Sequence, residues 1–177
     1  MKDGFIIPDN FEVPDYRASF FTARSYVESI FVMMSSKERF NLNRDAALAM
    51  SAMLLGGFAI ELYLKAYLQK KGVKDIKTHD LKRLFNLCKE KGFKDIEDPR
   101  IRALIELFAE RHKSGEFRYI KKGKYKHKLC NLPAFFDWFS VLDGVVTEAT
   151  GSCRYRDCSG EVGWKFRGEP NWRIERA

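Results

Sequence analysis

The fold of this chain is decided by residues 51–88, which read SAMLLGGFAIELYLKAYLQKKGVKDIKTHDLKRLFNLC. The stretch continues an apolar run that begins at Ala46 and ends at Ile60, just before the charged residue Glu61. A membrane-spanning helix needs about 20 consecutive apolar residues, and this run is shorter. The run therefore predicts a buried central helix, which extends from a cap at Asn43 to about residue 71.

Four further helices are predicted, because apolar residues recur at steps of three and four after residues that commonly start helices. The fourth helix of the chain carries His112 on its apolar face. Short connections between helices favour an all-α, antiparallel bundle of about five helices. The start signals of the four helices are Asp15, Thr78, Asp98 with Pro99, and Asn131 with Pro133, and their expected ends are Met34, Gly92, Lys113 and Gly151.

The bundle is expected to occupy residues 15–150, after an N-terminal arm at 1–14 and before a C-terminal tail at 151–177. In the tail, apolar residues alternate with polar ones around Ser159 and Gly160. A repeat of two residues is typical of β-strands, so the tail predicts a small β-hairpin-like appendage.

The sequence also bears on the cellular compartment. No basic start followed by an apolar stretch marks the first ten residues as a secretory signal. The chain has 4 cysteines, which without a secretory context are expected to be reduced thiols. We therefore expect a cytoplasmic protein with no membrane contact.

Two short motifs carry a resemblance to a known family. Residues 61–66, ELYLKA, and residues 78–81, THDL, resemble the helix and the helix start of the higher eukaryotes and prokaryotes nucleotide-binding (HEPN) family. With the flanking helices, the resemblance covers about residues 20–149. It implies a helical bundle, a homodimer and a place among RNases of toxin-antitoxin, phage-defence and CRISPR-linked systems or their inactive relatives. It also implies a partner protein such as a nucleotidyltransferase.

The catalytic motif of active family members is not found. Those members carry an arginine followed four to six residues later by a histidine. The chain has 3 histidines, His79, His112 and His127, and no arginine precedes any of them at that spacing. Lys122 before His127 is close to the pattern, but lysine lacks the bidentate fork that guanidinium offers a phosphate. We therefore carry over no catalytic residue and expect a protein that is not an enzyme.

The positive charge of the chain is concentrated in one segment. Residues 111–128 hold eight basic residues and one acidic residue, and so seven of the eight net positive charges. Aromatic residues lie between the basic ones, a combination suited to phosphates and stacked bases. We therefore expect this basic segment to bind RNA or another polyanion. The residues expected to take part are Arg111, Lys113, Arg118, Tyr119, Lys121, Lys122, Lys124, Tyr125, Lys126, His127 and Lys128.

A second candidate site is a cleft beside the central helix. Glu61 and Lys65 stand four residues apart and can form an ion pair on one face of that helix. His79 and Asp80 open the next helix, where a carboxylate is stabilised by the helix dipole. These four residues either have a structural role or line a ligand cleft.

Alternatives to a polyanion-binding module remain. One is a metal-independent RNase that uses His127 with Arg118, Lys122 and Tyr125, and another is a protein–protein interaction module. Zinc bound by His127 and three cysteines is a third idea, but the spacing of these residues is irregular, so no metal or cofactor is expected. The three cysteines are Cys130, Cys153 and Cys158.

Overall fold

The computed structural model of the protein describes residues 14–36, 45–116 and 131–152. These residues form five α-helices and a short 3-10 helix, η2, and they contain no strand. The prediction of an all-α fold with about five helices is therefore confirmed, whereas the arm and the hairpin lie outside the described residues. The elements are α1 (Asp15–Ser35), α2 (Asp45–Lys70), α3 (Leu81–Glu90), η2 (Lys94–Glu97), α4 (Pro99–Lys113) and α5 (Leu132–Thr150).

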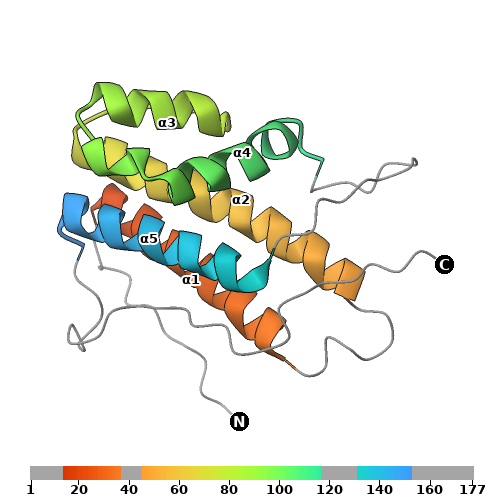
Figure 1. Cartoon of the computed structure of the whole chain (residues 1–177). Coiled ribbons are helices and arrows are strands. Elements are labelled where there is room, and N and C mark those ends of the chain that lie inside the picture. Colours follow the sequence, from red (N-terminus) through yellow and green to blue (C-terminus); the bar gives the residue numbers. More distant parts are fainter. Residues whose placement is uncertain (1–13, 37–44, 117–130, 153–177) are drawn as a thin grey trace, which may run out of the picture.

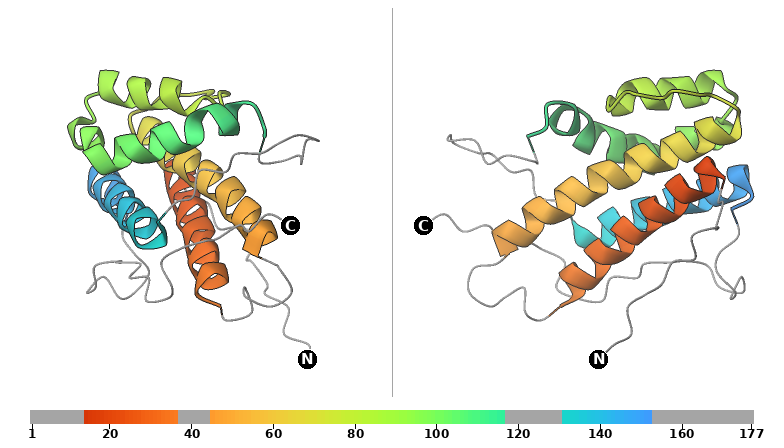
Figure 2. Two further views of the ribbon diagram at one scale, coloured as in Figure 1. Left: turned by 45° about the vertical axis from the view of Figure 1, so that its right-hand side comes forward. Right: turned by 180° about the vertical axis from the view of Figure 1, so that it is seen from behind.

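Helix α2 is the centre of the molecule, because it contacts α1, α3, α4 and α5. Figure 1 shows α3 and α4 on one side of α2, and α1 and α5 on the other. Seen from behind in Figure 2, α1 lies beside α2 along most of its length. The apolar character of α2 on all sides is therefore explained by neighbours on all sides.

The same helix is the one candidate for a membrane span among the described residues. By length and composition, the part from Leu48 to Lys70 is apolar enough to cross a bilayer. Half of its most apolar window, however, is buried inside the fold. Core helices of soluble proteins pass the same test, and the packing of α2 agrees with its expected role as a core helix.

The hydrophobic core is formed by the inward faces of all five helices. In α1 the apolar repeat predicted from the sequence is buried, which includes Phe20, Val27 and Ile30. The Phe20 ring meets the ring of Tyr63 edge to face, with centroids 5.6 Å apart. Edge-to-face contacts of this kind add to the free energy gained by burying the rings.

The N-terminal caps of two helices match the predicted start signals. Asp98 accepts a hydrogen bond from the amide of Arg100 at 2.8 Å and so caps α4. Asn131 accepts one from the amide of Ala134 at 3.3 Å and caps α5. Both side chains satisfy amides that the first turn of a helix leaves without an intrahelical partner.

Two other predicted caps are wrong. Asp15 is the first residue of α1, which has Pro14 at its N-cap and no side-chain cap hydrogen bond. Asp80 caps α3 by accepting from the amide of Arg83 at 3.1 Å, while the Thr78 hydroxyl instead accepts from the amide of Asp80. Thr78 therefore orders the turn before α3, and the helix begins two residues later than its side chain would indicate.

A buried polar cluster crosses the core. The Arg24 guanidinium on α1 donates from Nε to Oδ1 of Asp143 on α5 at 3.0 Å, and a second bond joins Nη2 to Oδ2. The Tyr63 hydroxyl on α2 also donates to Oδ1 of Asp143, at 2.7 Å. Burying a charge is costly unless it is paired and hydrogen-bonded, and these three side chains satisfy one another.

Candidate functional site

The candidate site is centred on Glu61, a buried carboxylate in the middle of α2. Lys65, one turn further along the helix, places Nζ 2.7 Å from Oε1 of Glu61. His112 Nε2 lies 2.7 Å from Oε2, and His79 Nδ1 lies 2.9 Å from the same oxygen. One carboxylate therefore gathers a lysine and two histidines, which we call the Glu61 cluster.

Three elements position these side chains. Glu61 and Lys65 belong to α2, and His112 belongs to the last turn of α4. His79 belongs to the turn before α3, which is held by the hydrogen bonds of Thr78 and Asp80. The cluster therefore exists only when α2, α4 and the start of α3 are packed together.

His112 is held closely by its surroundings. Its ring packs edge to face on the ring of Phe58, with centroids 5.1 Å apart. A Cβ at Gly57 would lie only 2.5 Å from His112 Nδ1, so a residue without a side chain is required at that point. The glycine therefore lets α4 bring its histidine against α2.

The cluster is buried on one side and open on the other. The side chains of Glu61 and His112 are 4% and 2% exposed, whereas that of His79 is 54% exposed. Because His79 turns Nδ1 toward the carboxylate, the other ring nitrogen points away from it. Of the two histidines, His79 is thus the one exposed to solvent.

The electrostatic environment keeps Glu61 ionised. Burial raises the pKa of this carboxyl, but hydrogen bonds from His112, Lys65 and His79 outweigh burial and lower the pKa to about 2. A carboxylate that accepts several hydrogen bonds is strongly favoured over its protonated form. The Glu61 carboxylate is therefore negatively charged and is surrounded by nitrogen atoms of Lys65, His79 and His112.

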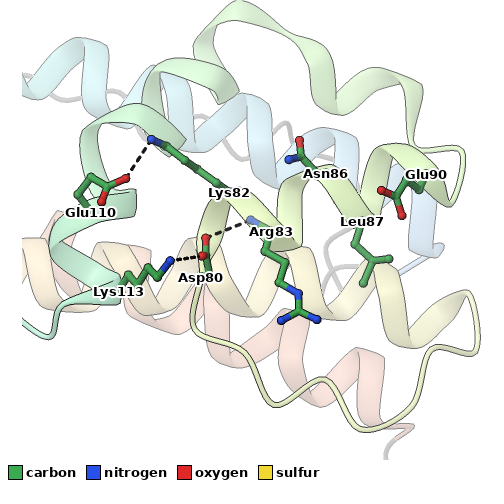
Figure 3. Close-up of a pocket in the computed structure, with 8 residues that line it drawn as sticks. All are labelled: Asp80, Lys82, Arg83, Asn86, Leu87, Glu90, Glu110 and Lys113. Atoms are coloured by element: carbon green, nitrogen blue, oxygen red, sulfur yellow. Dashed lines mark hydrogen bonds and ion pairs between the residues drawn. The ribbon is translucent and has the colours of Figure 1, made fainter.

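A cleft lies between α3 and α4, and its lining includes Asp80 and Lys113, which follow His79 and His112 in the sequence (Figure 3). On its wall Lys113 Nζ pairs with Oδ2 of Asp80 at 2.7 Å, and Lys82 pairs with Glu110 at 3.0 Å. The Arg83 guanidinium forms no ion pair with any residue that the structure describes. The lining residues are Asp80, Lys82, Arg83, Asn86, Leu87, Glu90, Glu110 and Lys113.

The structure brings together three of the four residues expected at the cleft. Glu61, Lys65 and His79 are in contact, whereas Asp80 faces Lys113 and caps α3. The residue that sequence reasoning missed is His112, which the apolar repeat of α4 places on a core face without a partner. A histidine at a core position was the one available signal, because burying a polar side chain requires a partner.

Only the beginning of the predicted basic segment is described. Arg111 and Lys113 belong to the last turn of α4, and Arg111 lies 3.9 Å from Glu116. The other residues expected to bind nucleic acid, which occupy positions 118–128, lie outside the described residues. So do the residues of the alternative RNase site and of the zinc arrangement.

Comparison with known proteins gives one finding. The family model of the HEPN domain matches residues 38–127, just over half of the chain. The match includes Glu61, His79 and His112 together with most of the basic segment. No curated protein and no solved structure matches the chain.

Proposed function

This chain belongs to the HEPN domain family, whose members are nucleotide-binding or RNase-like modules, and we propose that it is a module that binds single-stranded RNA. The binding surface of the proposal is the basic segment, residues 111–128, together with the end of α4 from which it continues. The observation that carries the proposal is the confinement of seven of the eight net positive charges to these residues.

The chemistry of the segment supports RNA as the polyanion. Lysine and arginine contact the phosphates, and each contact releases counterions from the nucleic acid. Phe117, Tyr119 and Tyr125 offer rings for base stacking, worth about 1–3 kcal/mol per base. Single-stranded RNA exposes both its phosphates and the faces of its bases, so it uses both properties of the segment.

The cleft between α3 and α4 supplies further cations beside the end of α4. Lys113 lines this cleft, as do Lys82 and Arg83 in the first turn of α3, whose side chains point in different directions (Figure 3). Lys82 and Lys113 are paired with carboxylates, which leaves Arg83 as the side chain best suited to a phosphate. The proposal therefore includes Arg83, in the first turn of α3, as a further phosphate contact.

The test is RNA binding at several salt concentrations. For the full chain, the logarithm of affinity should fall by about 0.7 per phosphate contact for each tenfold increase in salt. Replacing four lysines of the segment by alanine should abolish binding. The matched control removes the same charge elsewhere, at four exposed lysines, and should keep most of the affinity. The segment variant changes Lys121, Lys122, Lys124 and Lys126, and the control changes Lys74, Lys77, Lys91 and Lys94.

Two results would reject the proposal. One is an affinity that changes neither with salt nor in the segment variant. The other is an equal loss of affinity in the segment variant and the control, because net charge and not the segment would then govern binding.

A metal-independent RNase is the second candidate, and the Glu61–His79 contact favours it. A carboxylate that holds one ring nitrogen of a histidine leaves the other to exchange a proton with a 2′-hydroxyl. RNA cleavage that is lost in His79→Ala would support this candidate, and loss in His127→Ala would instead support the site in the basic segment. Binding without cleavage would support the module.

The proposal also includes a homodimer in the cytoplasm and a protein partner of the nucleotidyltransferase class. Light scattering coupled to gel filtration measures the mass of the purified protein directly. A mass of one chain, 20.6 kDa, at micromolar concentration would contradict the dimer.

A further inference from the structure

We propose that Glu61, His79 and His112 form a binding site for a divalent transition-metal ion of the Zn²⁺ class. The inference does not depend on RNA binding. It rests on the composition, spacing and burial of the three side chains, and each is argued in turn.

The donor atoms are of the right kind. Two imidazoles and one carboxylate are a common protein ligand set for zinc in sites that keep a fourth position open. Imidazole ligands suit Zn²⁺, Co²⁺, Ni²⁺ and Cu²⁺, whereas Mg²⁺ and Ca²⁺ prefer oxygen. Glu61 offers its carboxylate oxygen Oε2 beside a ring nitrogen of each histidine.

The spacing of the donor atoms is close to that of a metal site. The three ligand atoms all lie within 4.8 Å of one another. Bonds of about 2.0–2.2 Å in tetrahedral directions place donor atoms roughly 3.4 Å apart. Oε2 of Glu61 is 2.7 Å from His112 Nε2 and 2.9 Å from His79 Nδ1, so an ion requires each of these pairs to separate by part of an ångström. The two imidazole nitrogens, which lie within 4.8 Å of one another, must also stand about 3.4 Å apart.

The burial of the ligands divides the site into a fixed half and an adjustable half. Glu61 and His112 are almost fully buried, and His112 is confined by Gly57 and Phe58. His79 is half exposed and belongs to a turn, so it can make the small outward movement. The exposure of the His79 side chain makes this half of the site accessible from solvent.

Lys65 carries a positive charge that repels a bound cation, but the position of its amino group limits this repulsion. Its amino group binds Oε1 of Glu61, while His112 contacts Oε2 and His79 Nδ1 lies 2.9 Å from Oε2 and 3.1 Å from Oε1. A metal on Oε2 can therefore coexist with Lys65 on Oε1, as when a ligating carboxylate is hydrogen-bonded from a second side chain. The positive charge of Lys65 weakens the attraction of the site for a cation.

Metal binding changes which nitrogens of the two imidazoles carry protons. No other covalent bond of the protein is broken. Each ring nitrogen that faces Oε2 must offer its lone pair to the ion. The proton at that nitrogen therefore moves to the other ring nitrogen or leaves to solvent. Affinity should fall as the pH is lowered, because protons compete with the metal for the same atoms.

The test is a titration of the chelator-treated full chain with Zn²⁺ by calorimetry, and with Co²⁺ by visible absorption. We expect one ion per chain and a loss of affinity of ~100-fold or more in His79→Ala. His79 is the residue to change, since it is half exposed and its removal should leave the helices folded, which circular dichroism checks. Glu61→Gln, which keeps the side-chain shape, should behave in the same way.

The control variant removes the residues of the zinc arrangement that was considered from the sequence. A variant with His127→Ala and serine in place of Cys130, Cys153 and Cys158 should bind the ion as the parent does. Failure of the parent chain to bind either ion would overturn the proposal. So would binding that survives in His79→Ala and disappears in the control.

Discussion

The hydroxyl of Tyr63 donates a 2.7 Å hydrogen bond to Oδ1 of Asp143, and so joins α2 to α5 across 80 positions of sequence. The same carboxylate pairs with Arg24 of α1. Three helices are therefore connected at one buried carboxylate. Such a group is costly to disturb, because Arg24 would be left buried without a counter-charge and the Tyr63 hydroxyl without its acceptor.

Asp143→Ala should lower the free energy of unfolding by about 3–5 kcal/mol, since it leaves the Arg24 guanidinium buried without this carboxylate. Tyr63→Phe keeps the ion pair and should cost only about 1 kcal/mol. Asp137→Ala, at a half-exposed position of the same helix, is the control and should have a small effect. Urea unfolding followed by circular dichroism measures all three, and equal losses at positions 143 and 137 would contradict the prediction.

Gly57→Ala should displace His112 from Glu61, because the added Cβ would lie 2.5 Å from Nδ1 of the imidazole. We expect a loss of about 1–3 kcal/mol, as for other overpacked sites. Gly144→Ala is the matched control, because nothing lies within 4 Å of its added Cβ. Within helix α5 this change should stabilise by about 0.5–1 kcal/mol. Thermal unfolding that moves in the same direction for both variants would be inconsistent with this account.

Acid should destabilise the metal-free protein through Glu61. Its pKa of about 2 in the fold is lower than the ordinary 4.5, so the unfolded chain binds the proton more readily. The stabilisation is complete above pH ~4.5 and is lost as the pH falls toward 2, on the order of 3 kcal/mol in total. Glu61→Gln cannot titrate and should show a shallower decline in unfolding free energy over this range, measured with a chelator present. Parallel curves would refute the prediction.

The thiol of Cys88 should resist alkylation in the folded protein. Burial raises its pKa well above the ordinary range, and Sγ lies 3.6 Å from the carbonyl oxygen of Leu64. Because the thiolate is the reactive form, iodoacetamide should modify this cysteine only after unfolding. Mass spectrometry of the peptide that contains Cys88, with and without urea, measures the rate. Similar rates in the two conditions would show that the thiol is accessible.

Local sequence was sufficient for the helices and for part of the candidate site. The spacing of Glu61 and Lys65 predicted their pairing, because residues four apart meet on a helix. His112 could not be assigned to the same cluster, since its contact with Glu61 depends on how α4 packs against α2 across 51 positions. Local sequence likewise could not choose between Thr78 and Asp80 as the cap of α3, because both side chains accept backbone amides there.

The position of α2 also determines which backbone amides can exchange by local unfolding. Because this helix contacts each of the other four, none of its central amides can be released by detaching one neighbour. The slowest hydrogen–deuterium exchange should therefore occur around Ile60 and Leu64, and its free energy should equal that of complete unfolding. The exchange rate of the Glu61 amide then reports whether the whole fold unfolds cooperatively.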